Sequence, residues 1–148
     1  MSDRDQQIFR LYSYCQDFAG TMLREAGDFY PFGAAVDQMG EAQAFGASNG
    51  DERPEPRELY RMLEHGFSAG AKDGSFSIVA LAANVNVPHQ YNPPFPDGLR
   101  IHLEAPGFSR YIYVPYVARG EPGKAHEVTF AEPITVGIQA SFFSGSGA

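Results

Sequence analysis

The first part of the chain carries an apolar residue every three or four positions, which is the spacing of a helix with one buried face. We predict this helix over about residues 4–25. Ser2 or Asp3 can cap its start, and Gly27 stands where a left-handed residue would end it. Cys15 lies in the apolar stripe, so we expect a buried thiol. The stripe consists of Ile8, Leu11, Tyr12, Cys15, Phe18, Ala19, Met22 and Leu23.

A second helical pattern covers about residues 56–71, after a polar loop that contains two prolines. Charged residues alternate on its outer side, as on a solvated face. Gly66 and Gly70 either weaken this helix or allow it to pack closely on a sheet. Its expected buried stripe is Leu59, Met62, Leu63, Phe67 and Gly70.

Strands are predicted on both sides of the second helix. Residues 29–36 and 41–47 flank Asp37-Gln38-Met39-Gly40, which has the residues of a tight turn, so we predict a β-hairpin. Pro31 cannot donate to a ladder, which places the start of the first strand at an edge, at a bulge or outside the sheet. Residues 76–87 are apolar on both faces over much of their length. This pattern predicts a central strand with cover on both sides.

A further hairpin is predicted from residues 99–105 and 110–117, where apolar and polar positions alternate. Pairing Glu104 with Tyr111 and His102 with Tyr113 puts the apolar residues of both strands on one face. This register leaves residues 106–109 as a four-residue loop. The segments 126–134 and 135–143 could add one or two strands.

The order of these elements predicts one α+β domain. The order is α-β-β-α-β-β-β, and the hairpin links predict a single antiparallel sheet of about five strands with two helices covering at least one face. We assign residues 1–143 to the domain and 144–148 to a flexible tail. Profilin-like and roadblock-like domains have a similar order of elements, a likeness of fold that does not settle function.

Composition narrows the class of protein. A chain of 148 residues fits one domain, and a single cysteine cannot form an internal disulfide. No run approaches the ~20 apolar residues that span a bilayer, and the N-terminus lacks a long apolar leader, so we expect a cytoplasmic protein that is not bound to a membrane. The net charge of −7 argues against nucleic-acid binding and could complement a basic protein partner.

The candidate chemistry lies on the polar face of the second hairpin, on Arg100, His102, Glu104, Tyr111 and Tyr113. Histidine and glutamate two residues apart could form a general acid–base pair or part of a metal site, and the arginine could hold an anion. The same residues fit a solvated strand face with His–Tyr and Glu–Tyr contacts between strands, which is the interpretation we favour. Substituting the histidine or the glutamate should then change stability by no more than ~0.5 kcal/mol.

Histidine spacing gives little support to a metal site. His65, His89, His102 and His126 form no HxH, HxxxH or HExxH pattern. His102 and Glu104 with His89 or His126 remain geometrically possible, but we expect neither a metal nor a cofactor. The chain also lacks GxxxxGK[ST], a GxGxxG after a strand and GxSxG, which argues against common nucleotide sites and α/β-hydrolase chemistry.

Aromatic residues cluster in two other places. Phe29, Tyr30 and Phe32 surround Pro31 and could line a pocket, although core packing is the favoured use. Tyr91 and Phe95 lie in the proline-rich segment 88–98, which could present them to a partner or could merely cross the edge of the sheet.

The segment GDFYPFGAAVDQMGE resembles a signature of a family of small, uncharacterised bacterial proteins. Arg100-Ile101-His102-Leu103-Glu104 and Val114-Pro115-Tyr116 follow in the matching order. The resemblance covers about residues 25–143. It implies the fold and a bacterial origin, and because the family has no established activity it implies no catalytic residue.

Three hypotheses for function follow. The leading one is a non-catalytic binding or protein-interaction module that forms a homodimer, based on the missing catalytic motifs, the expected sheet edge and the aromatic residues. The first alternative is a small enzyme or a metal site built on Arg100, His102 and Glu104. The second alternative is an immunity or antitoxin-like protein that neutralises a basic toxin. The position of His102 and Glu104, in a concave pocket or on an open sheet face, separates the first two.

Overall fold

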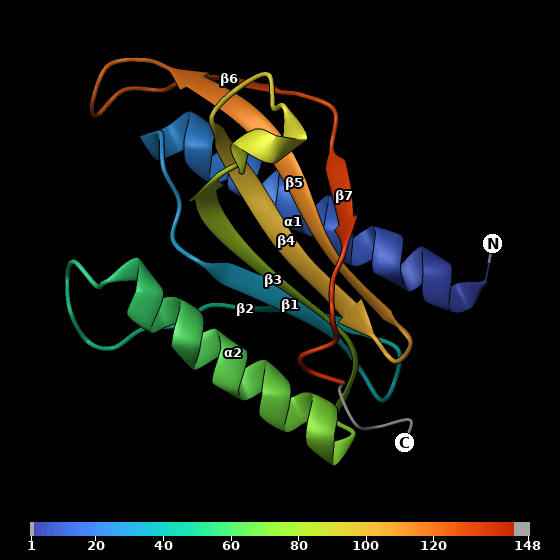
Figure 1. Cartoon of the computed structure of the whole chain (residues 1–148). Coiled ribbons are helices and arrows are strands. Elements are labelled where there is room, and N and C mark those ends of the chain that lie inside the picture. The colour runs from blue at the N-terminus through green and yellow to red at the C-terminus, as the bar shows by residue number, and fades with distance from the viewer. Residues whose placement is uncertain (1, 144–148) are drawn as a thin grey trace.

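The computed structural model describes residues 2–143, which form two α-helices and seven strands (Figure 1). The predicted flexible tail, residues 144–148, lies outside the described residues. A short 3-10 helix, η1 (His89–Tyr91), interrupts the segment before the fourth strand. The other elements are α1 (Asp3–Ala26), β1 (Phe32–Asp37), β2 (Ala42–Phe45), α2 (Pro56–Asp73), β3 (Phe76–Asn86), β4 (Asp97–Ala105), β5 (Phe108–Arg119), β6 (Glu127–Phe130) and β7 (Ile134–Gly137).

The seven strands form one antiparallel sheet in the order β2-β1-β3-β4-β5-β6, and β7 also pairs with β5. The α+β class and the single antiparallel sheet are therefore confirmed. The predicted number of about five strands is too low. β6 pairs with the end of β5, from Tyr116 to Arg119, and β7 pairs with its beginning, from Arg110 to Tyr113. Two strands of four residues each thus share one edge of a long strand, a pairing that local sequence patterns do not reveal.

The sheet is covered on both faces (Figure 1). α1 packs across β1, β3 and β4 on one face, and α2 packs on β3 and β1 on the other. β3 lies inside the sheet with apolar contacts on both sides, as its pattern predicted. Within residues 2–143, neither helix combines the length and apolar character needed to cross a membrane.

α1 begins and ends where its sequence signals predicted. The Ser2 hydroxyl accepts a hydrogen bond from the Asp5 amide at 3.1 Å. Gly27 has a left-handed φ of 75°, and its amide donates to the Leu23 carbonyl at 2.8 Å. Cys15 lies in the core with no exposed area, and burial raises the pKa of its thiol to about 12. The thiol is therefore a packed apolar group, as predicted.

α2 follows its predicted stripe with one exception. Leu59, Leu63, Phe67 and Gly70 are buried, but Met62 is 42% exposed. The prediction for Met62 is wrong because, at about 100° per residue, the buried positions fall within one narrow arc, and position 62 lies about 60° outside the Leu59 end of that arc. A β-carbon on Gly70 would lie 2.2 Å from a ring carbon of Phe76. Gly70 therefore permits close packing, the second of the two predicted uses.

The β4–β5 hairpin is predicted correctly in its faces and wrongly in its register. Glu104 lies opposite Ser109, His102 opposite Tyr111 and Arg100 opposite Tyr113. The turn has two residues, Pro106 and Gly107, instead of the predicted four. Side-chain alternation has a period of two, so it cannot distinguish registers that differ by two residues. Every side chain therefore stays on its predicted face.

The β1–β2 hairpin agrees with its prediction. The Asp37 carboxylate accepts hydrogen bonds from the amides of Met39 and Glu41, both at 2.9 Å. Gly40 has a φ of 80°, which a residue with a β-carbon rarely adopts. Pro31 precedes β1 and lies outside the sheet, one of the three predicted positions.

Candidate functional site

The five candidate residues lie together on the face of the sheet that α2 covers. Arg100, His102 and Glu104 follow one another at every second position of β4, and Tyr111 and Tyr113 lie beside them on β5. This face is not the open, solvated surface that we expected. His102 is 3% exposed and Glu104 is fully buried.

The Glu104 carboxylate is surrounded by donors from three parts of the chain. Its Oε1 accepts hydrogen bonds from the Ser109 hydroxyl and the Ser141 amide, both at 2.8 Å. Its Oε2 accepts from the amides of Phe142 and Phe143, the latter at 2.8 Å. Burial would raise the pKa of Glu104, but the hydrogen bonds from His102, from the two backbone amides of residues 141 and 143, and from Ser109 lower it to about 2. The carboxylate thus anchors the end of the described chain to β4.

His102 belongs to the same closed arrangement. Its Nε2 donates to Glu104 Oε1 at 3.2 Å. The ring of Phe142 lies 4.7 Å from the imidazole, centre to centre, and Tyr111 meets the imidazole edge-on at 5.3 Å. A His–Tyr contact is present, but it joins His102 to Tyr111 and not to the predicted Tyr113. Glu104 contacts Ser109 in place of the predicted tyrosine. The pair lies neither in a pocket nor on an open face, because residues 141–143 cover it.

The remaining histidines lie away from this pair. His65 is exposed on α2, His89 lies in η1, and His126 Nδ1 hydrogen-bonds the Lys124 carbonyl at 2.9 Å. Within residues 2–143, no three histidine, cysteine, aspartate or glutamate side chains gather closely enough to hold a metal ion.

Arg100 differs from the other four candidates because it lines a cavity. Its guanidinium lies 4.5 Å from the centre of the Tyr111 ring and 5.5 Å from that of Tyr60. Its Nη2 donates to the Tyr60 hydroxyl at 2.9 Å. Burial raises the pKa of Tyr60, although the charge of Arg100 lowers it, so this phenol stays protonated. Sequence analysis missed Tyr60, because it stands on the half-buried flank of α2 next to the stripe residue Leu59.

A cavity of about 630 Å³ opens beside Arg100, under the first half of α2. Its size falls in the range of small-molecule sites. The connection between α1 and β1, the end of β3, Arg100 of β4 and the first two turns of α2 form its walls. We call it the arginine cavity, and its lining residues are Asp28, Phe29, Tyr30, Pro31, Pro56, Arg57, Tyr60, Arg61, Glu64, Ala83, Asn84, Val85 and Arg100.

Hydrogen bonds hold one wall of the arginine cavity in place. Asn84 donates to the Asp28 carboxylate at 2.7 Å and accepts from the Tyr116 hydroxyl at 2.8 Å. The same Asp28 oxygen accepts from the Phe29 amide at 2.8 Å. Burial raises the pKa of Tyr116 to about 12, so its hydroxyl keeps the proton that it donates. The connection between α1 and β1 is thereby tied to the sheet.

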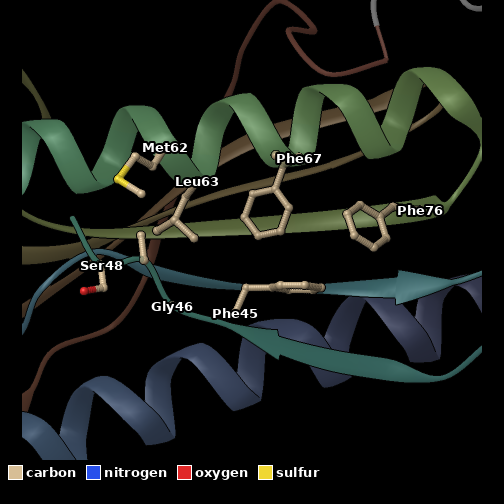
Figure 2. A pocket seen from close by; sticks show the side chains of 9 residues that line it. Phe45, Gly46, Ser48, Met62, Leu63, Phe67 and Phe76 are labelled. Carbon is tan, nitrogen blue, oxygen red and sulfur yellow. The ribbon is translucent and has the colours of Figure 1, made fainter. Parts of the chain in front are cut away.

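A second pocket, of about 290 Å³, lies between α2 and the end of β2 (Figure 2). Leu63 and Phe67 point from α2 toward Phe45, and Phe76 closes the row (Figure 2). The three phenylalanine rings meet edge-on, with centres 5.4 to 6.1 Å apart. Apart from Ser48, its lining residues are apolar or glycine, and none carries a charge, in contrast to the arginine cavity.

The aromatic clusters predicted from the sequence divide between core and surface. Phe29 and Phe32 are buried, in agreement with core packing, whereas Tyr30 is 50% exposed and lines the arginine cavity. The ring of Tyr91 packs against that of Tyr113 in a tilted arrangement, with ring centres 5.7 Å apart. The proline-rich segment therefore packs one of its two aromatic rings against β5.

Comparison of the chain with protein-family models, with curated proteins and with solved structures finds no match in any of the three. The resemblance to a family of small bacterial proteins and the likeness to profilin-like or roadblock-like domains stay predictions.

Proposed function

We propose that this protein is a non-catalytic binding module that takes up a small molecule in the arginine cavity. The observation that carries the proposal is the cavity itself, which has the volume of a small-molecule site and combines aromatic walls with convergent polar groups. Its walls come from a helix, two strands and a connection held by the Asp28–Asn84–Tyr116 hydrogen bonds. A site built on such elements needs little rearrangement to bind.

The buried pair on β4 supports binding over catalysis. A general acid or base must lie within hydrogen-bond reach of its substrate. The Glu104 carboxylate instead accepts hydrogen bonds from five donors of the chain, and Phe142 covers the imidazole of His102. Cys15 is enclosed between α1 and the sheet, and its raised pKa disfavours the reactive thiolate. Only Arg100, of the three residues in the enzyme hypothesis, faces the cavity.

Protein-observed NMR with a set of small neutral, anionic and cationic fragments tests this proposal. We expect fragments to shift the backbone signals of Tyr30, Ala83 and Arg100, and Ala83→Met, which fills the arginine cavity, to abolish these shifts. Ala47→Met makes the same change in the apolar pocket of Figure 2 and should leave them unchanged. If no fragment moves these signals, or if Ala47→Met has the same effect as Ala83→Met, the cavity is not a binding site.

The homodimer remains part of the proposal, through the outer edge of β2. Within residues 2–143, β2 pairs only with β1, and its residues are largely exposed, so its outer main-chain groups can pair with a second copy. Two-fold dimers are the commonest assemblies of identical chains. Sedimentation should show a dimer at micromolar concentration, and Ala44→Pro should convert it to a monomer because proline removes a donor from the edge. A wild-type monomer at high concentration would contradict the homodimer.

A further inference from the structure

The arginine cavity differs in charge from the rest of the chain. The protein carries a net charge of −7, yet three guanidinium groups line this cavity, with only Asp28 and Glu64 as acidic neighbours. Arg57 and Arg61 stand four residues apart on α2, an arrangement in which like charges repel and destabilise a helix. Arg100 reaches the same space from β4. Three arginines and two acidic residues give the lining a net charge of +1, whereas the chain as a whole carries −7.

None of these three cations forms an ion pair closer than 4.0 Å within residues 2–143. Within residues 2–143, the ion pairs closer than 4.0 Å are His102 with Glu104 and Lys124 with Glu121. Asp28 is already hydrogen-bonded to Asn84 and to the Phe29 amide. Arg57 and Arg61 are exposed, whereas Arg100 is partly buried. A partly buried guanidinium without a counter-charge is costly, and an anion beside Arg100 would offset that cost.

Arg100 is also held ready to bind. Its guanidinium lies over the ring of Tyr111, and Tyr60 accepts one of its hydrogen bonds. Its Nε is buried and has no hydrogen-bond partner in the described chain. With Nη2 donating to Tyr60 and Nε buried, the guanidinium offers the cavity its positive charge and its remaining N–H donors, which a carboxylate or phosphate oxygen can accept.

The first turn of α2 adds to the positive electrostatic potential in the arginine cavity. Pro56, at the start of the helix, lines the cavity, and the helix has no side-chain cap at Glu55. The N-terminal end of a helix carries partial positive charge, which favours an anion nearby, and Glu58 in this first turn partly offsets that charge. On the opposite wall, Tyr30 and Phe29 offer aromatic surface for the uncharged part of a ligand.

We propose that the arginine cavity binds a small organic oxyanion, whose carboxylate or phosphate group lies among Arg57, Arg61 and Arg100 and whose ring or apolar part lies against Tyr30. This inference rests on the proposed binding function and names the chemical class of its ligand.

The test compares three probes that share a phenyl ring and differ in their head group. Benzoate, phenyl phosphate and neutral benzamide are titrated into the labelled full-length protein at low ionic strength, and the backbone signals of Tyr30, Ala83 and Arg100 are followed. At least one of the two anions should bind at least about tenfold more tightly than benzamide. The tighter of the two identifies the carboxylate or the phosphate as the preferred group.

Three variants locate the charge effect. Arg100→Gln should weaken anion binding by at least about tenfold, and Arg61→Gln by a smaller factor, because Arg100 is the more enclosed cation. Arg61 is exposed on α2, so its variant keeps the test decisive even if Arg100→Gln fails to fold. Arg53→Gln makes the same change in net charge from the exposed loop before α2 and should leave the affinity unchanged.

The outcomes separate this inference from the proposed function. Equal affinity for benzamide and for both anions, or equal weakening by Arg53→Gln and Arg61→Gln, would overturn the anion assignment while leaving a cavity that binds neutral molecules. Absence of saturable shifts with all three probes would also overturn it. If the broader fragment set then shifts the same signals, the binding function survives without the anion.

Discussion

Both faces of the sheet are covered, but by segments of different backbone structure. A helix covers one face, whereas a helix and a segment without regular structure cover the other. On one face α1 packs through Ile8, Leu11, Cys15, Ala19 and Leu23, against apolar strand residues. A helix satisfies its own backbone hydrogen bonds, so an apolar surface beneath it is sufficient. On the other face, α2 packs mainly on β3 and β1, and the segment 141–143 covers part of β4.

That segment has no regular structure, so its amides need acceptors from elsewhere. Glu104 supplies them, and a buried carboxylate is therefore stabilising on this face. The same group under α1 would find no donor. The comparison shows that the backbone of the covering segment decides whether a strand can bury a charge.

The largest effect is expected from placing a carboxylate under α1. Cys15→Asp would bury a charge among apolar side chains, so we expect a loss of at least about 4 kcal/mol in the free energy of unfolding. Cys15→Ala should be tolerated and serves as the control. Urea denaturation measures the stability of both variants. In the wild-type protein, a thiol reagent should label Cys15 slowly in native buffer and fast in denaturant. Near-wild-type stability of Cys15→Asp would contradict the claim that a carboxylate buried under α1 finds no hydrogen-bond donor.

Removing the carboxylate on the other face should cost nearly as much. Glu104→Gln keeps the shape but places an amide nitrogen against backbone donors, so we expect a loss of about 3 kcal/mol. Hydrogen exchange should show faster exchange of the Ser141, Phe142 and Phe143 amides, without comparable loss of protection in α1. Glu25→Gln, on the exposed end of α1, should leave the denaturation midpoint unchanged. A change within ~0.5 kcal/mol for Glu104→Gln would restore the solvated-face interpretation.

The pH dependence of stability follows from the same carboxylate. The pKa of Glu104 is lowered from 4.5 to about 2 in the folded protein, so its ionised form stabilises the fold. This contribution, about 3 kcal/mol, is complete above about pH 4.5 and disappears as the pH falls through the folded pKa. Denaturation midpoints measured from pH 7 to pH 2 should therefore show the gap between wild type and Glu104→Gln closing at the acid end. A gap independent of pH would assign the effect of the variant to packing.

The smallest effects on stability are expected from glycine substitutions in α2, which test how closely this helix packs on the sheet. Gly70→Ala should destabilise by about 1–3 kcal/mol, because its β-carbon would collide with the Phe76 ring. Gly66→Ala, one turn earlier, meets no atom within 4 Å and should stabilise the helix by about 0.5–1 kcal/mol. Thermal denaturation of the two variants gives shifts of opposite sign. Shifts of the same sign would contradict the close packing of α2.

Local sequence patterns were sufficient for the elements and for the face that each strand residue occupies. The steps from Ile8 to Leu23 predict α1, and the turn from Asp37 to Gly40 predicts the first hairpin, because caps and turns depend on residues within a few positions of one another. The alternation around Ile101 and Ile112 places Arg100 and Glu104 on the same face for the same reason.

Interactions between distant residues were beyond such patterns. The β4–β5 register needed the two-residue turn at Pro106 and Gly107, since alternation accepts any shift of two. β6 and β7 share one edge of β5 through tertiary pairing. Met62 became exposed because the orientation of α2 depends on the sheet beneath it.

The candidate site shows the same division most clearly. By itself, the sequence determined that Arg100, His102 and Glu104 share one face of a strand, because side chains alternate along any strand. Only the tertiary structure decided their separate uses. Residues 141–143, almost forty positions away, close over Glu104 and His102, while α2 leaves Arg100 beside a cavity. Burial depends on which segments meet in space, and a strand pattern contains no information about the segment that will cover it.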